Sequence, residues 1–182
     1  MRKVVLGLGL LVASVLYADV VSQNGIAKDN VTGLIWQDEP YTSEEYRAYD
    51  NDLNYGKAGN WEYAKQYCKE LRLGGFSDWR LPNIYELVTL LDNTKSKAPH
   101  VINGLHNVTS ERYWSSNTVA SKKSNAWYVY FYDGKVIWDD KGYSSSVRCV
   151  RSGQVNFETL SSLKKNGVLK VAQEWIDKIN PK

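Results

Sequence analysis

The stretch "GGFSDWRLPNIYEL", residues Gly74–Leu87, holds the densest set of structural signals in the 182-residue chain. Pro82 cannot donate a backbone hydrogen bond and favours an extended residue before it. Asn83, followed three positions later by Glu86, has the spacing of a capping box. One apolar face then recurs at helical spacing: Ile84, Leu87, Val88 and Leu91. We therefore predict a helix after Pro82 and interpret these three residues as structural.

The triplet Asp78, Trp79 and Arg80 allows two interpretations. In an extended segment, Asp78 and Arg80 project from one face and Trp79 from the other. An Asp–Arg platform beside an aromatic ring suits a sugar. Alternatively, Trp79 belongs to the core and an ion pair fixes the turn before Pro82. The structural signals around the triplet favour the second interpretation.

A second helix is predicted just before this stretch, from an Asn60 cap to Leu73, with Gly74-Gly75 as its end. Its apolar face contains Trp61, Ala64, Cys68 and Leu71. Residues 25–36 indicate a strand, a turn and a returning strand, and residues 38–60 a polar surface loop.

Short strands are expected downstream. "AWYVYFYDGKVIW" (126–138) predicts a hairpin with Asp133-Gly134 as a two-residue turn, and "SVRCVR" (146–151) a final strand. After Gly153 the pattern predicts one amphipathic helix that ends at Pro181. Its apolar residues are Val168, Val171, Ala172, Trp175, Ile176 and Ile179. This helix either packs on the domain or docks on a partner.

The N-terminus has the features of a signal peptide. Arg2 and Lys3 precede an apolar run from Val4 to Leu16, and Ala18 is a small residue suited to cleavage. We expect residues 1–18 to be removed and the chain to be exported to the periplasm, cell surface or medium, with no stable membrane span; an uncleaved anchor is the alternative. Cleavage leaves 21 basic against 20 acidic residues, a balance that does not suggest nucleic-acid binding.

Cys68 and Cys149 are the only cysteines in the chain. In an exported protein, an even pair predicts one disulfide. The alternative, a pair of free redox thiols, lacks the usual CxxC spacing.

Five spaced segments resemble a known family. They are "TGLIW" (32–36), the 61–87 region ending in "LGGFSDWRLPNIYEL", "YWSSN" (113–117), "AWYVYFYDGKV" (126–136) and "VRCVRSG" (147–153). Their order and spacing resemble the bacterial DUF1566 domain, also called the Lcl C-terminal domain. The resemblance implies an α+β, C-type-lectin-like fold, with two helices beside short antiparallel sheets and a disulfide. It implies a domain over residues 19–153, followed by a helical extension over 154–182.

The resemblance also implies binding, since the adhesin that names the family is associated with sulfated glycosaminoglycans. Candidate aromatic contacts with sugar rings are Tyr128, Tyr130, Tyr132, Trp138 and Tyr143. Candidate arginines for sulfate or carboxylate are Arg112, Arg148 and Arg151. The alternative is that the tyrosines simply cover a small core.

We expect no cofactor, with calcium as the alternative. Asp139 and Asp140, in "WDD", loosely echo a lectin calcium signature. Asp50, Asp52 and Asn54 have the alternating spacing of a calcium loop, but the twelfth position is Trp61 rather than glutamate.

Catalysis has little support in the sequence. His100 and His106 lie in a predicted loop, and neither a GxSxG nor an HExxH pattern is present. We expect an exported, non-enzymatic binding module for a glycan or surface protein, with a sulfated or anionic polysaccharide as one candidate. The second hypothesis is a structural or assembly protein of the cell envelope that docks a partner through the C-terminal helix. A thiol- or metal-dependent enzyme related to formylglycine-generating enzymes is the third, and homo-oligomerisation stays open.

Overall fold

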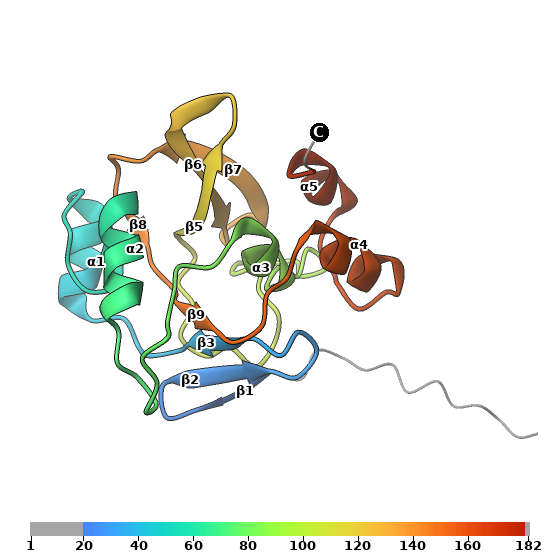
Figure 1. Ribbon diagram of the computed structural model, residues 1–182, viewed down its shortest axis with the longest axis horizontal. Coiled ribbons are helices and arrows are strands. Elements are labelled where there is room, and N and C mark those ends of the chain that lie inside the picture. Colours follow the sequence, from blue (N-terminus) through green and yellow to red (C-terminus); the bar gives the residue numbers. More distant parts are fainter. Residues whose placement is uncertain (1–19, 181–182) are drawn as a thin grey trace, which may run out of the picture.

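The computed structural model describes residues 20–180, which form a mixed α+β fold with two sheets (Figure 1). The predicted signal peptide therefore lies outside the described residues. The smaller sheet is antiparallel, in the order β1-β2-β3-β9. Its strands are β1 (Val20–Gln23), β2 (Ile26–Asp29), β3 (Ile35–Gln37) and β9 (Val150–Arg151). The strand–turn–strand prediction for residues 25–36 is confirmed by the pairing of β2 with β3.

The larger sheet has the order β4-β8-β5-β6-β7. Its strands are β4 (Ala58–Gly59), β5 (Arg112–Val119), β6 (Lys122–Tyr130), β7 (Lys135–Asp140) and β8 (Ser145–Ser146). The predicted two-residue turn at Asp133-Gly134 is wrong. Tyr130 pairs with Lys135, so the loop has four residues, because Phe131 turns inward and is fully buried.

Five helices occur among residues 20–180: α1 (Ser43–Asp50), α2 (Trp61–Glu70), α3 (Ile84–Thr89), α4 (Phe157–Lys165) and α5 (Gln173–Lys178). The predicted capping box of α3 is confirmed by reciprocal hydrogen bonds between Asn83 and Glu86. Helix α1 replaces part of the surface loop expected over 38–60. Thr42 and Glu45 form a second capping box there, a signal present in the sequence. Figure 1 places α1 and α2 on one side of the molecule and α4 and α5 on the other.

Helix α2 ends at Glu70, three residues before its predicted end at Leu73. Leu73 and Phe76 exchange both backbone hydrogen bonds, at 3.3 and 3.0 Å. Gly74 and Gly75 between them have φ of +62° and +79°, the values that a type I′ turn requires. The two glycines therefore form a tight turn rather than a helix end.

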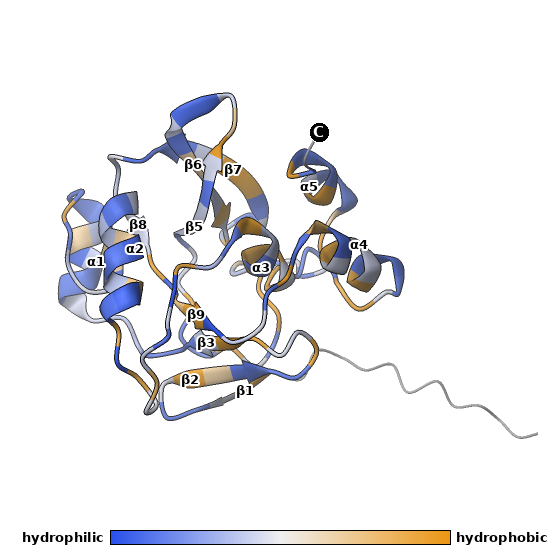
Figure 2. Ribbon diagram, viewed as in Figure 1, coloured by the Kyte–Doolittle hydropathy of each residue, from blue (hydrophilic) through white to orange (hydrophobic). Residues whose placement is uncertain are grey.

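Two hydrophobic clusters form the core. The first lies around α3, and the second around Trp61, Trp79 and Trp114 contains the disulfide. Cys68 and Cys149 are bonded with their Cα atoms 5.4 Å apart, so the predicted disulfide is present and joins α2 to the segment before β9. Figure 2 shows α1 and α2 mainly hydrophilic, in accord with the few buried residues of α1. In α3, by contrast, five of the six residues are buried.

The C-terminal segment packs into the first cluster instead of standing apart. Its buried members are Val155, Leu160, Leu169, Val171, Ile176 and Ile179. The predicted single helix over 168–179 is wrong. Asn93 bonds the carbonyl of Lys170 and the amide of Ala172, so this backbone is held outside a helix between α4 and α5. Within the described part of the chain, no helix is long and apolar enough to cross a membrane.

Candidate functional site

Arg112, the first residue of β5, lies at the centre of a polar and aromatic surface. Its Nε donates to Tyr49 Oη at 3.2 Å, its Nη1 to Asp139 Oδ2 at 3.1 Å and its Nη2 to the Ser144 carbonyl at 3.4 Å. The guanidinium carbon is 5.6 Å from the Tyr49 ring centroid and 6.0 Å from that of Tyr128. The contacts hold the charge in one orientation at a partly exposed position.

Strand register explains why these side chains meet. Arg112 lies directly opposite Tyr130, and Asp139 lies opposite Ala126. Opposite residues, and those two apart on one strand, share a face of an antiparallel sheet. Helix α1 adds Tyr49 from outside the sheet. We call this surface the Arg112 face and define it as Tyr49, Arg112, Tyr128, Tyr130, Tyr132 and Asp139.

The predicted tyrosine stripe reaches solvent only at its outer end. Tyr132 is 59% exposed, and its ring stacks on the half-buried Tyr130, with centroids 5.8 Å apart and an interplanar angle of 27°. Tyr128 is buried with its ring edge against Trp114, which makes it part of the core. The Tyr130–Tyr132 pair is therefore the exposed aromatic platform of the Arg112 face.

Burial raises the pKa of Tyr49 to about 12, and the Glu111 carboxylate adds to the rise while Arg112 opposes it. Burial also raises the pKa of Tyr130, with Glu111 and Asp133 as the next causes. Both phenols consequently keep their protons near neutral pH. They present neutral hydroxyl groups rather than negative charges.

The other two predicted arginines do not reach this face. Arg148 is buried; its Nη1 donates to the Gln37 carbonyl and to Asp38 Oδ1, the latter at 3.0 Å. Arg151 binds Asp78 through Nε and Nη2, at 2.7 and 3.2 Å, on the smaller sheet. The three candidate arginines therefore do not gather on one surface, since Arg148 is buried and Arg151 lies on the smaller sheet.

Asp78 and Arg80 do not form a joint platform. Arg80 binds Glu86 Oε2 at 2.7 Å and Oε1 at 2.8 Å, whereas Asp78 binds Arg151. Trp79 is buried in the second core cluster. The triplet therefore ties its loop to α3 and to β9 and packs the core.

Trp138 and Tyr143 are exposed but lie apart from the tyrosine platform. Trp138 pairs with Trp127 across the strands, which places it on the other face of the sheet, and Lys122 Nζ is 5.2 Å from its ring centroid. Tyr143 is half exposed in the turn after β7. Neither completes the site that the sequence suggested.

Four of the five predicted calcium ligands have hydrogen-bond partners within the chain. Asp52 Oδ1 accepts from the Ser144 amide, Asn54 Oδ1 from the Asn60 amide and Asp140 Oδ1 from the Gly142 amide. Asp50 ends α1, and Asp139 binds Arg112. Across residues 20–180, no three or more His, Cys, Asp or Glu side chains gather so as to hold a metal ion.

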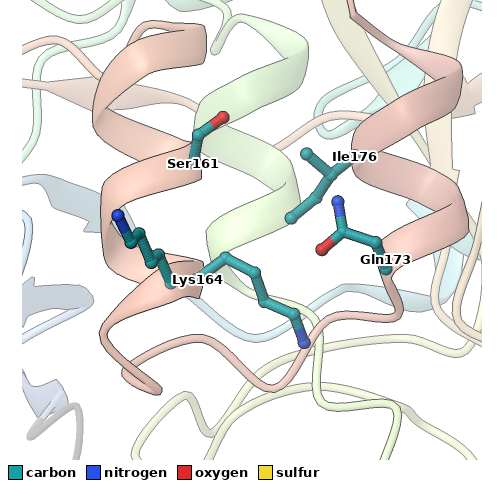
Figure 3. A pocket seen from close by; sticks show the side chains of 5 residues that line it. Ser161, Lys164, Gln173 and Ile176 are labelled. Atoms are coloured by element: carbon teal, nitrogen blue, oxygen red, sulfur yellow. The ribbon is translucent and has the colours of Figure 1, made fainter.

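Two hollows accompany the C-terminal helices. One of about 700 Å³ lies between the tip of the β5–β6 hairpin, the start of α3 and α5, with Trp127 and Tyr85 in its lining. Another of about 370 Å³ lies between α4 and α5, where Ser161 and Lys164 face Gln173 and Ile176 (Figure 3). Sequence reasoning missed both, because they arise only when the C-terminal segment folds back.

Residues 25–151 match the family described as the Lcl C-terminal domain. The chain belongs to the Lcl C-terminal domain family. Among curated proteins, no match was found. The whole Arg112 face lies inside this Lcl C-terminal domain, whereas α4 and α5 follow it.

Proposed function

We propose that this member of the family is an exported, non-enzymatic binding module with a C-type-lectin-like fold, and that it holds a glycan or another surface ligand on the Arg112 face. The observation that carries the proposal is the exposed Tyr130–Tyr132 stack beside the Arg112–Asp139 pair. Aromatic faces suit the apolar faces of sugar rings. A fixed carboxylate and guanidinium suit the hydroxyl groups at the ring edge.

The support of the site adds to this proposal. β5 pairs with β6 from Arg112 to Trp114, before a shift in register, and β6 pairs with β7 from Asn125 to Tyr130. Tyr49 and Ser144 bind the guanidinium from outside the strands. A site on a rigid sheet loses little freedom when its ligand binds. The disulfide is in keeping with export, since disulfides persist in oxidising compartments.

Partner docking through the C-terminal helix draws less support. Leu160, Ile176 and Ile179 are buried in the core of this chain, so the apolar faces of α4 and α5 already have partners. We therefore place the ligand on the Arg112 face.

A glycan array tests the proposal, with the wild type probed with and without a chelator. We expect retention of glycans in both conditions and about tenfold weaker retention by Tyr132→Ala, which removes a stacking surface. Tyr55→Ala is the matched control, because Tyr55 is exposed to a similar extent but lies outside the face. Equal losses in the two variants, or no retention of any glycan, would contradict the proposal.

A further inference from the structure

Arg112 and the neighbouring Lys135, the two cations at the Arg112 face, each have a carboxylate partner. Arg112 Nη1 is 3.1 Å from Asp139 Oδ2, and Lys135, which lies opposite Tyr130 in the neighbouring strand, has its Nζ 2.6 Å from Asp133 Oδ2. Glu111 adds a third carboxylate whose charge acts on Tyr130. Three carboxylates and two cations therefore lie around the Tyr130–Tyr132 platform, so negative groups outnumber positive ones there.

The Arg112 guanidinium also uses three of its five N–H groups within the chain, at least one on each nitrogen. Its three nitrogens bind Tyr49, Asp139 and the Ser144 carbonyl. A sulfate or carboxylate is held best by two parallel N–H groups of one guanidinium. Such a ligand would have to compete with Asp139 for the guanidinium and would be repelled by the carboxylates of Glu111 and Asp133.

An uncharged sugar meets none of these obstacles. Its hydroxyl groups donate to carboxylates, and the side chain of Asp139 is 35% exposed. The protonated tyrosines offer both a donor and an acceptor. The apolar face of the sugar ring covers the Tyr130–Tyr132 stack.

We propose that the Arg112 face selects uncharged, hydroxyl-rich sugars and discriminates against sulfated or acidic ones. This inference rests on the proposed function and names the ligand class of the same site. The Arg112–Asp139 pair then acts as a filter, since the aspartate occupies the position that a ligand anion would take.

The test is an array of matched oligosaccharides that share a backbone and differ only in sulfation, probed with the full chain at low and high salt. We expect neutral members to be retained, their sulfated counterparts to be retained at least about tenfold less, and neutral binding to change little with salt, because screening acts on charged ligands.

Asp139→Asn provides the sharper readout. The substitution removes the negative charge beside Arg112 and leaves only a neutral acceptor, so the ratio of sulfated to neutral binding should rise by about fivefold, the equivalent of one exposed ion pair. Asp140→Asn is the matched control, because Asp140 is the next residue on β7 but points to the other face and does not contact Arg112. It should leave the ratio unchanged.

The outcomes separate the two claims. Tighter binding of sulfated members, with a steep fall in salt, would overturn the inference while the proposed function stands. An unchanged ratio in Asp139→Asn, or the same rise in Asp140→Asn, would also overturn it. Retention of no member, neutral or sulfated, would overturn both.

Discussion

Arg148 and Arg112 lie beside tyrosine rings at very different depths. Arg148, 2% exposed, is 5.8 Å from the Tyr113 ring centroid and binds the fully buried Asp38. Arg112, 27% exposed, binds a partly exposed aspartate. In the sequence, both were candidate arginines for a sulfate or carboxylate group. Their roles depend on burial, which follows from contacts with partners 110 positions away for Arg148 and 27 to 63 positions away for Arg112, and which has no local signal.

Replacing Arg148 by methionine should destabilise the fold strongly. The variant leaves the carboxylate of Asp38 buried without its cation, a change that costs about 3–5 kcal/mol. Urea denaturation measures the loss. Arg47→Met, on the exposed surface of α1, is the control and should change stability by no more than about 0.5 kcal/mol. Similar stability of the two variants would refute a structural role for the buried pair.

Asp38 should make stability depend on acid pH. Burial alone raises its pKa, but hydrogen bonds from Ser22 and two backbone amides, with the charge of Arg148, outweigh burial and hold the pKa below 3.8. A lowered folded-state pKa stabilises the fold fully above about pH 4, and that stabilisation is lost as pH falls through the folded value.

The measurement is the urea midpoint across the acid range, for the wild type and for Asp38→Asn. The wild type should lose stability more steeply below about pH 4, because only it gains a proton at this position. Ser22→Ala keeps the carboxylate but removes one hydrogen bond that lowers its pKa, so its slope should be intermediate. Identical slopes in all three proteins would show that Asp38 is not the group responsible.

Among the elements, α3 was the most predictable, because Pro82, the capping box and the apolar spacing agree within ten residues. Helix α1 carries an equivalent box at Thr42 and Glu45, but its polar surroundings give little apolar periodicity. Gly74-Gly75 fits both a helix end and a tight turn. Only the pairing of Leu73 with Phe76 decides between them.

Gly75→Ala should destabilise the protein through this turn. The backbone of Gly75 has φ of +79° with no atom within 4 Å of a built Cβ, so the cost is conformational, about 1–2 kcal/mol. Gly75→Asn should cost clearly less, since asparagine tolerates the left-handed region. Thermal or urea unfolding of both variants provides the test. An alanine variant as stable as the asparagine variant would argue against the type I′ turn.

At the scale of the whole molecule, the C-terminal segment belongs to the same folded unit as the family domain. The sequence predicted that this segment is amphipathic but not which surface it packs against, because an apolar face can pack on any apolar partner. The structure places it against α3 and β7. The Arg112 face was predicted only in part. Strand alternation in the sequence predicted that Tyr130 and Tyr132 share a face, but the contacts of Tyr49 and Asp139 with Arg112 depend on the tertiary fold.

Leu160→Ala tests that shared core. Leu160 is fully buried in the first cluster, so its truncation should cost about 2–5 kcal/mol of global stability in a single cooperative transition. Leu53→Ala, at a leucine that is 58% exposed, should cost no more than about 0.5 kcal/mol. A separate, low-stability transition confined to the C-terminal helices would contradict a shared core.

An NMR titration of the full chain, with the neutral oligosaccharide that the array retains best, tests directly whether the Arg112 face binds the ligand. We expect the largest shifts at the Arg112 Nε–H and at the amides of Tyr130, Tyr132 and Asp139, and we expect them to vanish in Tyr132→Ala. Shifts concentrated instead around Trp127 and α5, at the larger hollow, would contradict binding at the Arg112 face.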